Sequence, residues 1–196
     1  MKDHIAPQPD ASADQLMRAY RELETAPHQA VTTLIPMAEG GTPMAMLYLA
    51  YAFRNGIGVA CDLELAEAWY RRAVDAGLHR AHYHLGRLFL DSSRYAEAMM
   101  EFEQAASKSF MPGVHFLGRI YYFGLGVPAD KEKGRELLSE AAGWGCVFAK
   151  ALVAHDLIRR GEDIWSVFRG AFTKLGCYVE LLRIAWSEGT GSDRLR

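Results

Sequence analysis

Apolar residues recur at spacings of three and four along most of the chain. Two sets illustrate the pattern: Leu85, Leu88 and Phe89 in one segment, and Ala66, Trp69, Tyr70 and Ala73 in another. This is the 3.6-residue period of helices that bury one face. The pattern therefore predicts an all-α chain, with no strand of four or more residues between positions 43 and 145.

The helical pattern also repeats as a larger unit. The octapeptides NGIGVACD (55–62) and FGLGVPAD (123–130) share Gly-x-Gly-Val and a final Asp, each between two predicted helices. A third copy, FLDSSRYAEA, makes the same connection without the glycine insert. Equivalent small residues at Ala45, Ala81, Gly113 and Ala149 are 36, 32 and 36 residues apart. A period in the thirties is typical of arrays of helix pairs.

The Gly-x-Gly strings have two interpretations. A phosphate cradle needs a preceding strand and further motif residues, and neither string has them. The alternative is structural: glycines at positive φ end the first helix of each pair, and Asp62 and Asp130 cap the second helix. The side chains of Val59 and Val127 would pack into the core and anchor each turn. The sequence favours the structural interpretation, with a tighter turn at 91–94 in the middle copy.

Domain organisation follows from these repeats. We expect a loose tail at 1–10 and a divergent helix pair at 11–42, capped by Ser12 or Asp14 and kinked or shortened by Pro36. Three repeats should cover 43–77, 78–109 and 110–145, followed by a degenerate repeat and C-terminal capping helices over 146–190. The helices over 164–175 and 178–186 carry apolar stripes that suit a cap or an oligomer contact.

The combination of Leu-Gly or Leu-Ala, an aromatic residue, Gly-x-Gly-Val, Asp and Ala-x-x-x-Gly resembles the Sel1-like repeat, a relative of the tetratricopeptide repeat. The match covers roughly residues 43–145, and the middle copy has tetratricopeptide spacing. Gly134 and Leu138 depart from the motif's preference for alanine and an aromatic residue. The resemblance implies an α-α superhelix, or solenoid, that binds other proteins, often as a bacterial adaptor in signalling or envelope processes.

Composition changes this picture little. Half of the residues are hydrophobic, and the net charge of −2 gives no reason to expect nucleic acid as a partner. The first ten residues lack the apolar core of a secretory signal, and no run suits a membrane span. Three cysteines without metal spacing suit a reducing compartment, so we expect a cytoplasmic protein without a cofactor.

Residues with catalytic or metal-binding chemistry are few. His79, His82 and His84 are too closely spaced to share one helical face, so we expect no metal site. Lys174 precedes Cys177 and could lower the pKa of its thiol, although an inert cysteine in a capping helix is the plainer interpretation. Asp62 and Asp130 are expected to be caps rather than paired acids. No catalytic set emerges.

The first helices of the repeats offer a candidate binding surface. In tetratricopeptide arrays this helix lines the concave groove, and the resemblance carries that role to equivalent positions here. One such column runs Tyr51, Arg87, Arg119 and His155. Arginine and aromatic side chains suit a peptide that is acidic or has a free carboxylate. The predicted partner-binding residues are Tyr51, Arg54, Tyr83, Arg87, His115, Arg119, Tyr122 and His155.

Two classes of function remain open at the level of sequence. The first is a non-enzymatic module that binds a protein or peptide in the groove, and this is the interpretation we favour. The second is an enzyme, or a regulatory subunit of one, that uses the C-terminal helices and Cys177. Self-assembly through the C-terminal apolar helices is a narrower third option. Arg87 and Arg119 have an alternative of their own, as solubilising residues on an exposed helix face.

Overall fold

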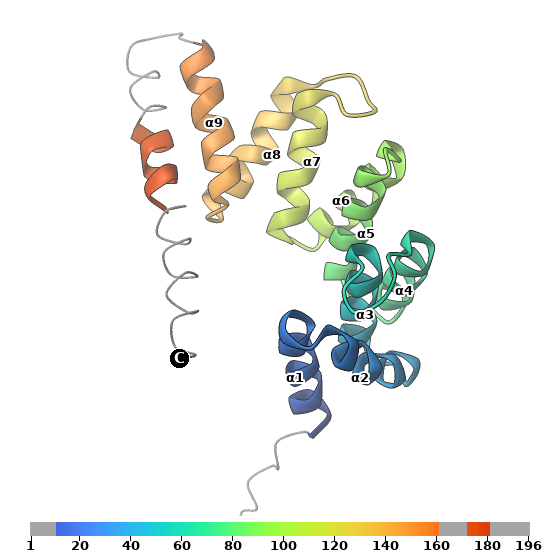
Figure 1. Cartoon of the computed structure of the whole chain (residues 1–196). Coiled ribbons are helices and arrows are strands. Elements are labelled where there is room, and N and C mark those ends of the chain that lie inside the picture. The colour runs from blue at the N-terminus through green and yellow to red at the C-terminus, as the bar shows by residue number, and fades with distance from the viewer. Residues whose placement is uncertain (1–10, 161–171, 181–196) are drawn as a thin grey trace, which may run out of the picture. The chain divides into compact units, whose positions relative to one another are not determined.

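The chain folds into helices arranged in consecutive antiparallel pairs (Figure 1). The computed structural model describes residues 11–160 and 172–180. The helices are α1 (Ala11–Thr25), α2 (Pro27–Glu39), α3 (Pro43–Asn55), α4 (Leu63–Asp75), α5 (Arg80–Asp91), α6 (Tyr95–Ser107), α7 (Met111–Phe123), α8 (Lys131–Gly143) and α9 (Val147–Arg160). Residues 172–180 are also helical. No strand occurs between residues 43 and 145, so the predicted all-α solenoid fold is confirmed.

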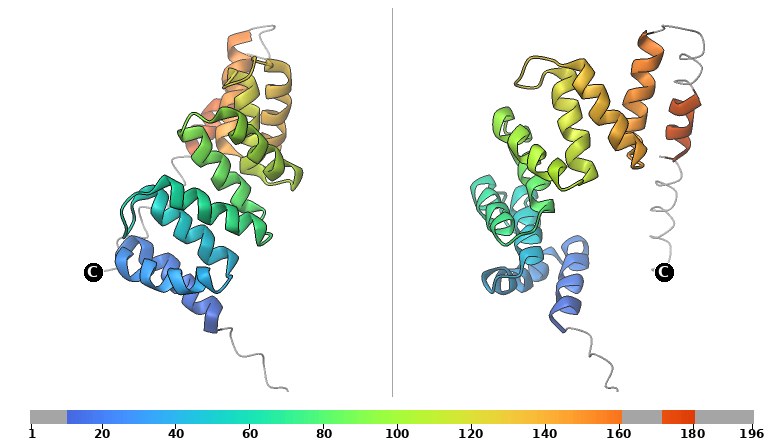
Figure 2. Two further views of the ribbon diagram at one scale, coloured as in Figure 1. Left: turned by 90° about the vertical axis from the view of Figure 1, so that its right-hand side faces the viewer. Right: turned by 180° about the vertical axis from the view of Figure 1, so that it is seen from behind.

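The chain divides between Glu101 and Phe102 into two compact units, and the boundary falls inside α6. In the first unit, α1 packs against α2, α2 against α3, α3 against α4 and α4 against α5, and α1 also contacts α3. In the second unit, α7 packs against α8 and α8 against α9 (Figure 2). Packing between sequence neighbours is the arrangement expected of a repeat array.

The glycine loops adopt the conformation that the sequence predicts. Gly56 and Gly124 follow the last residues of α3 and α7 at φ values of 67° and 68°, in the left-handed region. Gly58 and Gly126 are also positive, at 70° and 72°. Only glycine adopts this conformation without steric cost, so each loop ends its helix and reverses the chain. The middle connection is a shorter turn, with Ser93 at φ 59°.

Aspartates start the second helix of both glycine-containing pairs. The Asp62 carboxylate accepts a hydrogen bond from the Leu65 amide at 2.9 Å, and Asp130 accepts one from the Lys133 amide at 3.0 Å. Both predicted N-caps are confirmed. Val59 and Val127 are only half-buried, so they cover the turns without entering the core fully.

In the first helix pair, the predicted N-cap of α1 and the predicted shortening of α2 are wrong, while a kink at Pro36 stays a prediction. Helix α1 already includes Ala11, so neither Ser12 nor Asp14 is its N-cap. Pro36 does not shorten α2, which runs on to Glu39 and is as long as α3. Because Pro36 lies near the end of the helix, few hydrogen bonds follow it, and its carbonyl still accepts one from the Gly40 amide at 2.9 Å.

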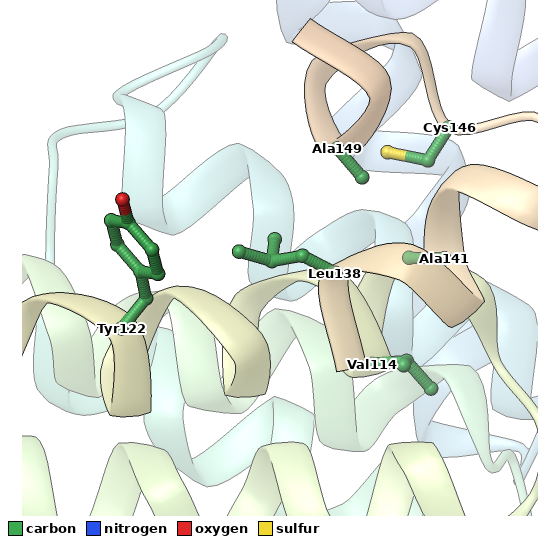
Figure 3. Packing of buried hydrophobic residues seen from close by; sticks show 6 residues of the cluster. All are labelled: Val114, Tyr122, Leu138, Ala141, Cys146 and Ala149. Atoms are coloured by element: carbon green, nitrogen blue, oxygen red, sulfur yellow. The ribbon is translucent and has the colours of Figure 1, made fainter. Parts of the chain in front are cut away.

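Small residues set how closely the helices approach. A Cβ at Gly134 would lie 2.6 Å from the Tyr122 amide nitrogen, and one at Gly113 would lie 2.6 Å from the Ala105 Cβ. The departure of Gly134 from the repeat motif therefore has a physical cause, since the backbone of α7 occupies the space that an alanine methyl would need. Figure 3 shows the resulting core of the second unit, where α7, α8 and α9 meet. This core contains Val114, Tyr122, Leu138, Ala141, Cys146 and Ala149.

An aromatic contact joins successive repeats at equivalent positions. In the first unit, the His84 ring on α5 stacks on Tyr70 of α4, with centroids 5.8 Å apart. In the second unit, Phe116 on α7 stacks on Phe102 of α6 at 5.2 Å. Tyr70 and Phe102 occupy the same repeat position, as do His84 and Phe116. The repeated sequence therefore encodes the aromatic contact between neighbouring helix pairs in addition to the helices.

The glycine loops generate a stability prediction. A Cβ at Gly58 would lie 2.3 Å from the Pro27 carbonyl oxygen, whereas one at Gly77, also at positive φ (82°), would meet nothing within 4 Å. We expect Gly77→Ala to cost about 1–2 kcal/mol through backbone strain alone. Gly58→Ala should cost at least about 1 kcal/mol more, because the loop must also move away from α2. Urea unfolding of the two variants measures the difference.

Equal losses for Gly58→Ala and Gly77→Ala would show that the loop relaxes and that its contact with α2 contributes nothing. If the loops instead held a phosphate, substitution at Gly56 or Gly58 would weaken nucleotide binding and leave the melting temperature unchanged.

Candidate functional site

A pocket of about 390 Å³ opens in the first unit between α1, α3 and α5. Helices α3 and α5 are first helices of their pairs, the ones predicted to carry the binding surface. The pocket is lined by Tyr20, Leu23, Glu24, Leu47, Tyr48, Tyr51, Ile57, Arg80 and His84. It therefore combines aromatic and aliphatic walls with a few charged or polar groups, which is the usual composition of a binding site.

Tyrosines form one wall of this pocket. The rings of Tyr20 on α1 and Tyr48 on α3 stack with their centroids 4.6 Å apart. Burial and the neighbouring Tyr20 raise the pKa of Tyr48, while the positive charge of Arg80 opposes the shift. Tyr51 lies one helical turn beyond Leu47 and is 40% exposed. A ring that is exposed beside a pocket offers contact area at low entropic cost.

Three arginines act electrostatically on His84, one of the residues that line the pocket. Burial, with smaller contributions from the charges of Arg54, Arg80 and Arg87, lowers the pKa of His84 to about 4. The imidazole is therefore neutral at pH 7. Arg54 forms an ion pair with Asp91. Arg80 is exposed and forms no ion pair within the described part of the chain.

The predicted site residues of the first unit take different positions. Tyr51 lines the pocket, together with Leu47 of α3 and Arg80 of α5, which are not among the predicted binding residues. The Arg54 side chain is only 14% exposed. Arg87 is half-buried and donates a hydrogen bond to the Tyr83 hydroxyl at 3.3 Å, which holds these two side chains together on α5.

In the second unit, Arg119 and His155 are accessible and His115 is not. The guanidinium of Arg119 lies over the Phe116 ring, 5.1 Å from its centroid, and His155 is exposed on α9. His115 is 7% exposed and lies edge-on to Phe116. Burial, with a smaller contribution from Arg119, lowers the pKa of His115 to about 4. In this structure His115 is a packing residue.

Tyr122 belongs to a buried polar network. Its hydroxyl donates to the Asp156 carboxylate at 2.5 Å, and the Arg135 Nε donates to the other carboxylate oxygen at 2.6 Å. The network joins α7, α8 and α9. Burial would raise the pKa of Asp156, but the hydrogen bonds from Tyr122 and Arg135 outweigh it and hold the pKa below its usual value.

Sequence reasoning missed Tyr20, Tyr48 and Glu24 at the pocket. Tyr20 and Glu24 lie in α1, where the repeat motif is absent and no alignment assigns a groove position. Tyr48 and His84 share a repeat position. The aromatic rings at this position were the one sequence signal that could have indicated the pocket. The stacking of His84 on Tyr70 shows that it also contributes to packing between helices.

The remaining candidate residues show no catalytic arrangement. No group of three His, Cys, Asp or Glu side chains within residues 11–160 and 172–180 could hold a metal ion. His82 instead pairs with Glu101, with 2.7 Å between Nδ1 and Oε2. For Cys177, the alternative of a thiol with a lowered pKa is wrong, and the plainer interpretation of an inert cysteine agrees with the structure. The thiol is buried, and burial together with Glu180 raises its pKa, while Lys150 only partly opposes the shift.

The fold is that of a helical repeat protein, and its first unit carries an open pocket. A family model for the Sel1 repeat matches residues 43–78 and 113–143. Both segments are therefore Sel1 repeats, the repeat that the sequence pattern resembles. Sel1 repeat proteins generally mediate protein–protein interactions and are typically non-catalytic.

Known proteins support this assignment. The structure of a Sel1 repeat protein from Oxalobacter formigenes matches 86% of this chain and 75% of its own, with a TM-score of 0.73 and 22% identity. A protective antigen of uropathogenic Escherichia coli with an SLR fold gives a TM-score of 0.68 at 22% identity, over 84% of this chain and 38% of its own. Both likenesses concern the fold.

A Sel1-like repeat-containing protein of Acanthamoeba polyphaga mimivirus is 26% identical over 98 residues, half of this chain. The aligned part is 18% of the viral protein, so the chain spans a small fraction of that relative's length. Among the described helices, none has the length and apolar character needed to cross a membrane.

The Asp156 network predicts an acid-sensitive contribution to stability. The pKa of Asp156 is lowered in the folded protein, so the ionised carboxylate stabilises the fold fully at pH values above its usual pKa of 3.8. This stabilisation is lost as the pH falls through the lower pKa of the folded state. Asp156→Asn should cost about 1–3 kcal/mol at pH 7. Its difference from wild type should shrink below about pH 4. Urea unfolding from pH 7 to pH 2.5 measures both effects.

Glu136→Gln, which changes an exposed carboxylate on α8, is the matched control and should have little effect at any pH. If the Asp156→Asn difference stayed constant down to pH 2.5, the ionised carboxylate would have no part in stabilising the fold.

Proposed function

We propose that this chain is a non-enzymatic adaptor or scaffold that binds a peptide or protein partner along the first helices of its repeats. The observation that carries the proposal is the pocket of the first unit, which α1, α3 and α5 line with tyrosine and arginine side chains. Tyr51, Arg54, Tyr83 and Arg87 would contact the partner in this unit. In the second unit Arg119 and His155 would contact the partner. His115 and Tyr122 are buried and would support the surface by packing.

The charges support a partner that is acidic or has a free carboxylate. Arg54, Arg80 and Arg87 all act electrostatically on the half-buried His84, and the exposed Arg80 forms no ion pair within the described part of the chain. Arg119 adds a cation on α7 in the second unit. Guanidinium groups bind carboxylates with two parallel hydrogen bonds, so an acidic peptide would gain specificity as well as affinity.

The proposal includes a cytoplasmic location in a bacterium. Cys61, Cys146 and Cys177 are all free thiols, which suits a reducing compartment. Several structural relatives come from bacteria, among them Oxalobacter formigenes and Escherichia coli. Fractionation of the source cells tests the location.

Self-assembly is a second candidate function, and one observation favours it. Phe172, Leu175, Tyr178 and Val179 are exposed on the helix at 172–180. Light scattering over a hundredfold range of concentration distinguishes this alternative, because a dimer formed through this face would dissociate after Leu175→Asp. An enzymatic role for this region has no support from the buried Cys177.

The arginines generate a binding prediction. Once a partner is identified, Arg87→Ala and Arg119→Ala should each weaken its binding by roughly ten- to a hundredfold, because each removes a charge-assisted contact to a carboxylate. Isothermal titration calorimetry at 150 mM salt measures the affinities.

Arg72→Ala is the control. Arg72 is exposed on α4, a second helix, and lies over the Trp69 ring at 4.7 Å. Its removal should leave affinity unchanged. Equal affinities for all three variants would leave Arg87 and Arg119 as solubilising residues on an exposed helix face.

A further inference from the structure

The pocket of the first unit has two chemically distinct parts. Leu47 and Ile57 lie among the tyrosines, so this part of the lining is apolar and aromatic. Arg80 and His84 line the part contributed by α5, where they stand four residues apart on one face of the helix. An apolar cavity with a cation at its edge selects ligands that carry both features.

The dimensions favour one residue of a peptide over a cofactor. Pockets for small molecules range over about 300–1,000 Å³, and this one lies near the lower limit at about 390 Å³. Its walls come from three helices, and the exposed Tyr20 and Tyr51 keep it open to solvent. An extended chain can therefore lie along the surface while one side chain enters the pocket.

The charges favour an anionic ligand over a cationic one. Glu24 also lines the pocket, so three tyrosines and a carboxylate could in principle hold an ammonium group. However, Arg80 acts electrostatically on both Tyr48 and His84, and Arg54 and Arg87 add further positive charge at His84. A cation in the pocket would meet this field, whereas a carboxylate would be attracted by it.

We propose that the pocket binds an apolar residue of a partner peptide whose adjacent carboxylate pairs with Arg80. The carboxylate is the peptide's C-terminus, on the same residue as the apolar side chain. The inference rests on the proposed interaction function and adds the chemistry that this part of the surface recognises. The neutral His84 ring and the tyrosine hydroxyls supply further hydrogen-bonding groups beside the carboxylate.

Small probes test this chemistry without knowledge of the partner. N-acetyl-L-leucine combines the side chain and the carboxylate, N-acetyl-L-leucinamide lacks the charge, and acetate lacks the side chain. Chemical-shift titrations of the full chain should show the leucine carboxylate binding at Tyr48 and His84 at least about tenfold more tightly than the amide or acetate.

Two variants assign the two parts of the pocket. Arg80→Gln should abolish the preference for the carboxylate over its amide, and Tyr51→Ala should weaken both leucine probes by a similar factor. Arg72→Ala is the control and should change neither affinity. An unperturbed spectrum elsewhere in the chain shows that each variant is folded.

Three results would overturn the inference. They are equal affinities for N-acetyl-L-leucine and its amide, a higher affinity for N-acetyl-L-lysinamide than for N-acetyl-L-leucine, or no binding of N-acetyl-L-leucine at a concentration of about 20 mM. A lysine preference would assign the pocket to Glu24 and the tyrosines. None of these results would contradict the proposed interaction function, which the partner titrations of Arg87→Ala and Arg119→Ala test separately.

Discussion

The close approach of helices at small residues is the constraint on which the rest of this structure depends. Alanine or glycine at Ala45, Ala81, Gly113 and Ala149 is buried at the start of each first helix. At Gly134 the backbone of the neighbouring helix lies where even a methyl group would clash. Helices that approach this closely leave little room for adjustment, because protein interiors are packed like crystals. The spacing of the small residues therefore determines the spacing of the helices.

Larger side chains then act between one pair and the next. Tyr70 and Phe102 are fully buried on the second helices, and each stacks against a ring at the same position of the following pair. Tyr48 has the equivalent position in the first full repeat, but it stacks on Tyr20 of α1 instead. The pocket lies beside this exception, where α1, which lacks the repeat motif, meets α3. A departure from the repeat thus coincides with the pocket of the first unit.

Sequence reasoning predicted the fold well because its signals are local. Gly56 and Gly124 require positive φ, and Asp62 and Asp130 require an adjacent helix start, so each residue type indicates its own conformation. Binding residues are different, since exposure depends on which helix packs against them. His115 and Tyr122 occupy first-helix positions like those of Tyr51 and Arg87, yet packing within the second unit buries them. Tyr20 was missed because α1 lacks the repeat motif that would have aligned it.

The central claim is that partners bind the first helices of the repeats rather than the second helices. Site-specific photocrosslinking in the source cells tests it most directly, with p-benzoylphenylalanine in place of Tyr51 on α3 or of Leu65 on α4. The two side chains are almost equally exposed, at 40% and 44%, so accessibility does not bias the comparison. The account predicts that a discrete crosslinked partner forms from position 51 and is absent from position 65. Crosslinks to the same protein from position 65 alone, or equally from both positions, would contradict it.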